Sequence, residues 1–384
     1  MSTAVRVGVR AFGVAALALG FAAQGLLAQW RAEVTGEGRL FGPAYETALV
    51  LDAEFQHTWD RGRQILRVEP YVRWDPSGER NRIDFVELAW AYFWERWELK
   101  AGLREVFWGV SESRHLVDVI NQRDLVVGGQ GYLKLGQPML ALATVQSWGT
   151  VEFILMPWFR ERRFDGRAGQ LWSTTPVDAT QPVYKSGARN TRLDWAIRWS
   201  HTVGDWDFGL SHLSGTRREP GFLPGEDASG RAVLVPYYDV VDQTGVDVQW
   251  TRGNWLWKLE AVTLNPTTGR YLAAAGGLEY AFADYFSVFA EYLFDSRGSA
   301  ATTSFADDLF VGARLLLQDG QLQGGAFVDR ETSNSVLRLA LTWRLGSSAT
   351  LAVEAGSFLG DESLEPAFAP RQHDYLSLAV TRYF

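Results

Sequence analysis

The chain contains 384 residues with a formal net charge of −8, no cysteine, 38 glycines, 17 tryptophans, 13 tyrosines and 22 phenylalanines. The absence of cysteine excludes disulfides, thiol nucleophiles, iron–sulfur clusters and thiolate zinc sites. The acidic balance argues against a nucleic-acid partner, because phosphate binding requires a concentrated cationic surface. So many aromatic residues are unusual in the core of a soluble enzyme but typical of the two interfacial girdles of a membrane barrel.

Residues 1–28 have the pattern of a secretory signal peptide. Arg6 and Arg10 precede an apolar run over residues 12–27, and small residues suited to cleavage end at Ala28. A retained membrane helix is the alternative, but the run is short and strand-like sequence begins directly after it. We therefore expect cleavage after Ala28 and a mature chain of residues 29–384. No later stretch is expected to form a membrane-spanning helix, because glycine and proline interrupt the longest uncharged segment.

Period-two alternation begins soon after the expected cleavage site and recurs to the end of the chain. Residues 66–74 are one example, in which an apolar face alternates with a face of Arg67, Glu69 and Arg73. Because successive side chains of a strand point to opposite faces, each such segment has one apolar and one polar surface. A soluble β-sandwich shows the same alternation. Here, however, many polar faces are fully charged, and strands of about ten residues match a tilted crossing of the hydrocarbon.

The lengths of the connections favour a barrel over a sandwich. The expected strands cover residues 30–41, 46–59, 64–74, 82–94, 97–107, 137–146, 150–162, 191–201, 206–215, 240–251, 255–264, 270–281, 286–295, 309–318, 321–330, 336–345, 349–358 and 373–384. Every second connection is tight, and the long ones fall between them, at 108–136, 163–190, 216–239, 296–308 and 359–372. We therefore predict an all-β fold, a transmembrane antiparallel up-and-down β-barrel with about 18 strands, or about 16, formed by residues 29–384.

If the apolar faces point to lipid, the charged faces line the interior of the barrel. A barrel of this size is wide enough to hold an aqueous lumen. The expected pore-lining residues are Arg67, Arg73, Arg104, Arg198, Arg314, Arg338, Arg344, Glu69, Glu87, Glu260, Glu291 and Glu354. Two roles remain open for them: a transverse field that favours polar or charged solutes, or pairing across neighbouring strands that stabilises the wall.

A family resemblance adds a constriction to this picture. The strand expected at 97–107 is followed by Trp108 and Gly109, and then by a loop that contains Asp118, Asn121 and Asp124. This segment is similar to porin-like outer-membrane proteins of proteobacteria, and more distantly resembles alginate-export barrels. The resemblance implies a passive channel whose loops fold inward, so we assign Trp108 and these three residues to a constriction loop. Their oxygens would suit calcium, but a hydrogen-bonded turn is the more general expectation for so short a motif, and we predict no metal site.

Two other segments suggest partners. Arg160, Arg162, Arg163 and Arg167 form a basic cluster that either steers anions, binds lipopolysaccharide phosphates, or is an ordinary solvated rim. The chain ends in an alternating strand and Phe384, which resembles the signal that the barrel-assembly machinery recognises, although Arg382 departs from it. We expect outer-membrane lipid, lipopolysaccharide and this machinery as partners. The sequence leaves open whether the barrel forms a homotrimer.

An enzyme is the main alternative to a channel, because some outer-membrane barrels are hydrolases. Ser111, Ser113, His115 and Asp118 are close in sequence, but a nucleophile–base pair depends on geometry. The histidines show no metal-like spacing, and we expect no cofactor. A structural or surface-binding barrel is the remaining alternative. The sequence therefore favours a porin-like outer-membrane channel, not an enzyme, for passive diffusion of small polar or charged solutes.

Overall fold

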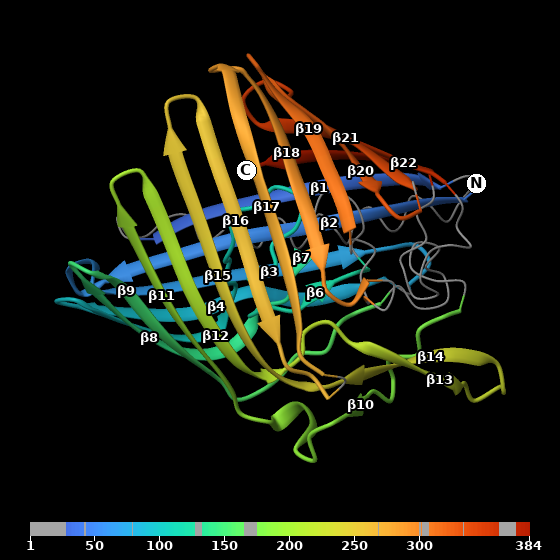
Figure 1. The fold of residues 1–384 in the computed structure, drawn as a ribbon, viewed down its shortest axis with the longest axis horizontal. Coiled ribbons are helices and arrows are strands. Elements are labelled where there is room, and N and C mark those ends of the chain that lie inside the picture. The colour runs from blue at the N-terminus through green and yellow to red at the C-terminus, as the bar shows by residue number, and fades with distance from the viewer. Residues whose placement is uncertain are drawn as a thin grey trace.

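The computed structural model is an all-β barrel (Figure 1). The structure describes residues 28–41, 44–78, 80–126, 133–164, 175–267, 269–298, 301, 307–332, 334–360 and 374–384. The predicted signal peptide therefore lies outside the described residues, except for Ala28. The described helices are two short 3-10 segments, η1 (Asp60–Gly62) and η2 (Arg189–Thr191). No helix in these ranges combines the length and the apolar character needed to cross a membrane.

Eighteen strands form the wall of the barrel, which confirms the predicted fold and the larger of the two predicted strand numbers. Each wall strand pairs antiparallel with its neighbours, and pairing of the first strand with the last closes the sheet. These strands are β1 (Ala28–Phe41), β2 (Ala44–Trp59), β3 (Gln64–Trp74), β4 (Arg82–Trp94), β5 (Trp97–Arg104), β8 (Gln137–Gln146), β9 (Gly149–Met156), β11 (Asp194–Val203), β12 (Trp206–Thr216), β15 (Val240–Arg252), β16 (Trp255–Leu264), β17 (Tyr271–Ala283), β18 (Phe286–Asp295), β19 (Asp307–Leu317), β20 (Gly320–Asp329), β21 (Ser335–Arg344), β22 (Ala349–Leu359) and β23 (Tyr375–Tyr383). Closure leaves no strand edge exposed, which is the requirement for a sheet in hydrocarbon.

The tight turns and the long connections lie at opposite ends of the barrel (Figure 1). At the turn end, β11 and β12 are joined by Gly204 and Asp205, and β15 and β16 by Gly253 and Asn254. Both glycines adopt positive φ, 60° and 57°, which costs a glycine little. At the loop end, β10 (Val183–Tyr184), β13 (Gly221–Glu226) and β14 (Ala232–Tyr238) form a separate small sheet.

The wall has its apolar side chains on the outside and charged side chains on the inside. On β16, Trp257 and Leu259 are each 44% exposed, whereas Lys258 is 7% and Glu260 0% exposed. This alternation inverts the arrangement of a soluble protein and matches a barrel surrounded by lipid. Aromatic rings gather at the turn end: Trp206 stacks on Trp250 with ring centroids 5.1 Å apart. Such rings are typical of a membrane–water interface.

Two segments differ from the sequence prediction. The strand expected at 150–162 ends as β9 at Met156, because the chain then leaves the wall. The N–H of Phe159 donates to the carbonyl of Asn190 at 2.7 Å, and its ring packs on Tyr238 at 4.9 Å. The connection expected at 216–239 contains the β13–β14 hairpin, which the sequence analysis treated as a loop. Both differences arise from contacts within the loops rather than from the strand pattern.

The interior of the barrel also contains an apolar core, whereas the sequence analysis predicted an aqueous lumen. Residues 105–122, which we call the inner loop, run between β5 and β8 inside the barrel. Val117 and Ile120 of this loop are fully buried and pack with Ile154 on β9 and Val262 on β16. The other members of this cluster are Val106, Trp108, Met139, Ala141, Met156, Ala196, Leu213, Leu264, Tyr271 and Ala273. Several wall strands therefore turn apolar side chains inward where the inner loop covers them.

Candidate functional site

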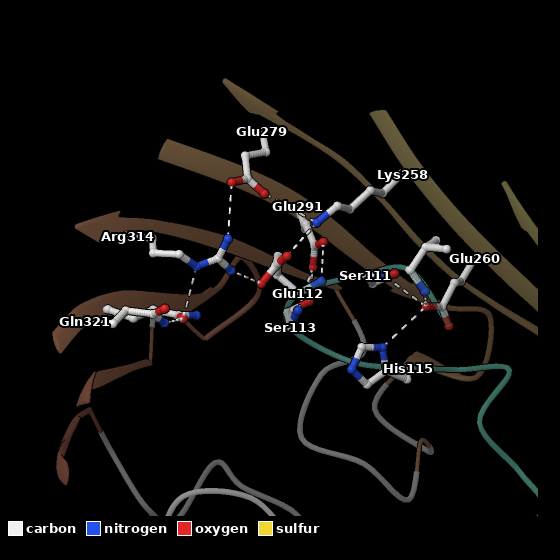
Figure 2. Close-up of polar contacts among 12 residues, drawn as sticks. Ser111, Glu112, Ser113, His115, Lys258, Glu260, Glu279, Glu291, Arg314 and Gln321 are labelled. Atoms are coloured by element: carbon white, nitrogen blue, oxygen red, sulfur yellow. Dashed lines mark hydrogen bonds and ion pairs between the residues drawn. The ribbon is translucent and has the colours of Figure 1, made fainter. Parts of the chain in front are cut away.

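The first feature of the site is a carboxylate on the wall that holds the backbone of the inner loop. Glu260 of β16 is fully buried. Its oxygens accept hydrogen bonds from the N–H groups of Val110 at 2.7 Å, Ser111 at 2.9 Å and Val117 at 3.1 Å. Figure 2 shows this carboxylate between Ser111 and His115, whose Nδ1 lies 3.6 Å away. Bonds from N–H groups to an ionised acceptor are stronger than neutral ones.

A second wall carboxylate holds the next residues of the same loop. Glu291 of β18 accepts hydrogen bonds from the N–H groups of Glu112 at 2.7 Å and Ser113 at 2.8 Å, and from the Ser113 hydroxyl. Glu260 and Glu291, which we call the carboxylate clamp, thus bind mainly main-chain groups. The clamp fixes the path of the loop regardless of most of its side chains.

The side chain of Glu112 adds a third attachment on the same part of the wall (Figure 2). Its carboxylate pairs with Lys258 at 2.5 Å and with Arg314 at 2.6 Å. Both cations also approach Glu279, at 3.4 Å and 3.3 Å. Burial opposes ionisation of Glu112, but the hydrogen bond and charge of Lys258, together with Arg314, outweigh it. The pKa of this carboxyl is therefore held below its ordinary value of 4.5.

This lowered pKa predicts how acid affects the loop. The ion pairs of Glu112 stabilise the folded loop at every pH above the ordinary value and are lost only as the pH falls through the lowered folded-state value. We expect Glu112→Gln to lower the melting temperature at pH 7 and pH 5 by a few degrees, on the order of 2 °C. The difference should vanish only when the pH is well below the ordinary value of 4.5. Thermal unfolding of both proteins in detergent measures it, and a difference already absent at pH 5 would contradict the assignment.

The predicted constriction residues lie in or beside the inner loop. Trp108 is 5% exposed, and the guanidinium of Arg198 lies 5.2 Å from its ring. Asp118 accepts from Lys134 Nζ at 2.8 Å. Asn121 accepts from the N–H of Val106 at 2.7 Å, and its amide donates to two backbone carbonyls.

Asp124 lies further along the same connection and is fully buried. Its carboxylate pairs with Arg82 at 2.6 Å. The polar atoms of Asp118, Asn121 and Asp124 thus hold chain segments together, as in the hydrogen-bonded alternative. Within the described ranges, no group of three or more His, Asp or Glu side chains is arranged to hold a metal ion.

Most of the predicted pore-lining residues form ion pairs across strands. Arg67 of β3 contacts Glu54 of β2 and Glu87 of β4, each at 3.1 Å, and also Glu69 of its own strand at 2.6 Å. Arg198 binds both oxygens of Asp247 at 2.8 Å. The other pairs are Arg73–Glu37 at 2.6 Å, Arg104–Glu152 at 3.6 Å and the contacts of Arg314 given above. For these residues the geometry matches the wall-stabilising alternative.

Three predicted residues are placed differently. Arg338 lies over the Phe327 ring, 5.7 Å from its centroid, and has no ion-pair partner within the described ranges. Glu354 accepts from the Tyr375 hydroxyl at 3.0 Å. The side chain of Arg344 is 64% exposed at the turn end of β21 and donates to the carbonyl of Gln318 at 3.1 Å.

The three described residues of the predicted basic cluster bind neighbouring segments of the chain. Arg160 pairs with Asp84 at 2.5 Å, and Arg163 approaches Asp124 at 3.6 Å. Arg162 donates to the side chain of Gln122 at 2.9 Å. Arg167 lies outside the described residues.

The residues of the hydrolase alternative do not form a nucleophile–base pair. The Ser113 hydroxyl donates a hydrogen bond to Glu291. The Ser111 hydroxyl is buried with no hydrogen-bond partner in the described part of the chain. His115 approaches Glu260, and no described hydrogen bond joins it to either serine. A nucleophilic serine requires such a bond to its base.

Beside the inner loop, on the side of the long connections, lies a cavity of about 580 Å³. Its cationic lining consists of Arg114, Arg123, Lys134, Arg162, Arg217, Arg218, Arg297 and Arg338. Among the described residues, its acidic lining consists of Asp118, Glu219 and Asp295. The alternation pattern identified Arg338, but it missed Arg114, Arg217 and Arg297, because these lie in connections without a repeating pattern. The adjacent arginines Arg217 and Arg218 were the available signal in the sequence.

Comparison with known proteins identifies the fold. No protein-family model matches the sequence, and no curated protein is significantly similar to it. OccK2 (OpdF) from Pseudomonas aeruginosa matches with a TM-score of 0.59 and 12% identity, over 94% of this chain and 99% of that chain. OccK5 (OpdH) from the same organism matches with a TM-score of 0.58 and 11% identity, over 93% and 97%. OccK11 (OpdR) gives 0.56 and 10%, over 93% and 95%. The chain thus has the fold of the OccK porins.

Proposed function

We propose that this protein is an outer-membrane channel through which small anionic solutes diffuse passively. The observation that carries the proposal is the cavity, where eight cationic and three acidic side chains of the described residues meet inside a barrel with an apolar exterior. Fixed positive charge in a confined space raises the local concentration of anions and excludes cations. The clamped inner loop narrows the passage, in the role predicted for Trp108, Asp118, Asn121 and Asp124.

Two further observations support a channel over an enzyme or a structural barrel. Ser111, Ser113 and His115 lack the geometry of a hydrolase site, whereas arginine side chains line the cavity. In addition, OccK2, which shares the fold, has been solved in complex with glucuronate, an organic anion. For the present chain, the same class of solute fits the charge of the cavity.

The exterior and the chain ends support a placement in the outer membrane. We infer that residues 1–28 are removed as a signal peptide and that residues 29–384 form the barrel. The apolar exterior contacts lipid, with lipopolysaccharide at the loop end. Phe384, which is 65% exposed, completes the strand that the barrel-assembly machinery binds.

The refolded barrel in planar bilayers tests the proposed function. We expect stepwise conductance without any energy source, and a reversal potential in a KCl gradient that indicates preference for chloride. Arg338→Gln should lower the chloride-to-potassium permeability ratio by about twofold, because it removes a lining charge. Arg344→Gln, at the exposed turn end, is the matched control and should leave the ratio unchanged. Silence at all salts and voltages, or a preference for potassium, would contradict the proposal.

A further inference from the structure

Glu260, the first carboxylate of the clamp, has no lysine or arginine partner among the described residues. Its side chain is fully buried, and within the same ranges the ionisable side chain in contact with it is His115, at 3.6 Å. By contrast, the carboxylate of Glu112 pairs with Lys258 at 2.5 Å. A buried charge is costly unless an opposite charge lies beside it. The N–H groups that bind Glu260 are dipoles without net charge, so His115 is the group that can complete its neutralisation.

Packing holds the ring of His115 between this carboxylate and the cavity. Its buried Nδ1 is the atom near Glu260 (Figure 2), whereas the side chain as a whole is 29% exposed and lines the cavity. The ring centroids of His115 and Phe107 lie 4.7 Å apart in an edge-to-face contact. Gly109 packs closely on the same contact, since a Cβ there would lie 2.8 Å from Oε1 of Glu260 and 2.9 Å from Nδ1 of His115. The imidazole therefore has little room to turn away from the carboxylate.

The contact with Glu260 also decides which ring nitrogen gains a proton. An unprotonated Nδ1 would direct its lone pair at a carboxylate oxygen, so in the neutral ring Nδ1 carries the proton and Nε2 does not. Acidification then protonates Nε2 and produces an imidazolium beside Glu260. Hydrogen bonds between charged partners are shorter and stronger than those between neutral groups. Protonation thus strengthens the attachment of His115 to the wall and adds one positive charge to the cavity lining.

The other charged side chains near His115 pair with one another or bind backbone groups. They are Glu112, Arg114 and Asp118 of the inner loop, Lys258 of β16, Glu291 of β18, and Lys134, which lies against Phe107. The ordinary titration ranges of these residue types lie outside pH 6–8, whereas that of histidine lies within it.

The remaining described histidines lie on the outer face of the wall. His57 and His201 contact the rings of Trp59 and Trp199, and His212 shares a hydrogen bond with Thr244. Their outward direction follows from the alternation along each strand, because it places them on the same face as exposed apolar residues. Among the described histidines, His115 is therefore the one whose charge acts on the cavity.

We propose that His115 is a pH sensor of the channel, which on acidification binds Glu260 as a cation, tightens the inner loop and makes the cavity more positive. The inference rests on the proposed channel function and adds a regulation to it. Between pH 8 and pH 6, the channel becomes more selective for anions and its inner loop moves less. The proton is taken from water in the cavity and returned as the pH rises, so the change is reversible.

Reversal potentials at two pH values test the sensor. The chloride-to-potassium permeability ratio of refolded barrels is measured in planar bilayers, in a KCl gradient, at pH 8 and at pH 6. The ratio of wild type should rise by about twofold on acidification, because the lining gains one charge. His115→Gln keeps a polar side chain that does not titrate, and it should give the same ratio at both pH values. His201→Gln, on the outer face, is the matched control and should respond like wild type.

Open-channel noise reports on the loop itself. Wild type should be quieter at pH 6 than at pH 8, because the loop is bound more tightly, whereas the noise of His115→Gln should not depend on pH. This second measurement separates a tightened loop from a change in charge alone. Equal noise of wild type at the two pH values would contradict the proposed tightening.

The outcomes also separate the sensor from the proposed function. A wild-type barrel that does not conduct, or that prefers potassium at both pH values, would overturn the anion channel and with it the sensor. A chloride-selective barrel whose ratio is unchanged by pH, or changes equally in His115→Gln, would overturn the sensor alone. If His115→Gln does not refold, His115→Lys decides, because its permanent charge should hold the ratio at the acidic level at both pH values. A wild-type pH response in that variant also contradicts the sensor.

Discussion

Shortening the inner loop should increase the single-channel conductance on the order of twofold, because the loop occupies the interior of the barrel. We would replace residues 111–116 with two glycines. The N–H groups of Val110 and Val117 both donate to Glu260, so the two ends of the deletion already lie close enough for so short a linker. Val117 and Ile120 remain, and with them the apolar core. Planar-bilayer recordings of refolded protein measure the effect.

A variant of unchanged length controls for altered chemistry in the loop. Ser113→Ala removes a hydroxyl that binds Glu291 but keeps every backbone group, and it should conduct like wild type. If the shortened barrel refolds and its conductance equals that of wild type, the narrowest part of the passage lies away from residues 111–116. That result would remove the constriction role of the inner loop.

Removing the carboxylate clamp should release the loop without unfolding the barrel. In the double variant Glu260→Gln and Glu291→Gln, the five backbone N–H donors described above lose an ionised acceptor. Hydrogen bonds to charged groups contribute about 1.5–3 kcal/mol each. The strand ladder is unchanged, so we expect a folded barrel whose open current flickers between several levels. Single-channel noise at constant voltage is the measurement.

Glu279→Gln is the matched control for the clamp. Glu279 also points into the barrel, but it contacts the side chains of Lys258 and Arg314 and no described backbone N–H group of the loop. Its amide variant should give a steady current. If the double variant shows as little current noise as Glu279→Gln, the apolar core alone positions the loop.

The barrel could be predicted from sequence because the alternation of apolar and polar residues is visible within each strand. The alternation of residues 255–264 decides which side chains face outward; it predicts that Glu260 faces the interior, and in the structure this side chain is fully buried. Turn length then sets the order of strands, since a tight turn leaves only antiparallel neighbours. These signals are local, so they can be recognised without any knowledge of the tertiary structure.

The site could be predicted only in part, because its contacts join segments far apart in the chain. Alternation indicated that Glu260 points inward, but its partners are N–H groups about 150 residues earlier, which have no sequence signature. Likewise, Glu219 and Arg114 meet between two connections that lack a periodic pattern. Val262 lies on the same inward face of β16 as Glu260, and it is buried because Ile120 and Val117 cover it. Local pattern identifies the face of a strand but not what covers that face.

Attachment through the main chain has a practical consequence for engineering. Because Glu260 and Glu291 bind peptide groups, the side chains of residues such as Ser111 and His115 can be exchanged while their positions are kept. The segment therefore serves as a replaceable cassette, in which aromatic, acidic or metal-chelating residues would be displayed at one defined depth of a nanopore. Sensors for different analytes would then share a single scaffold.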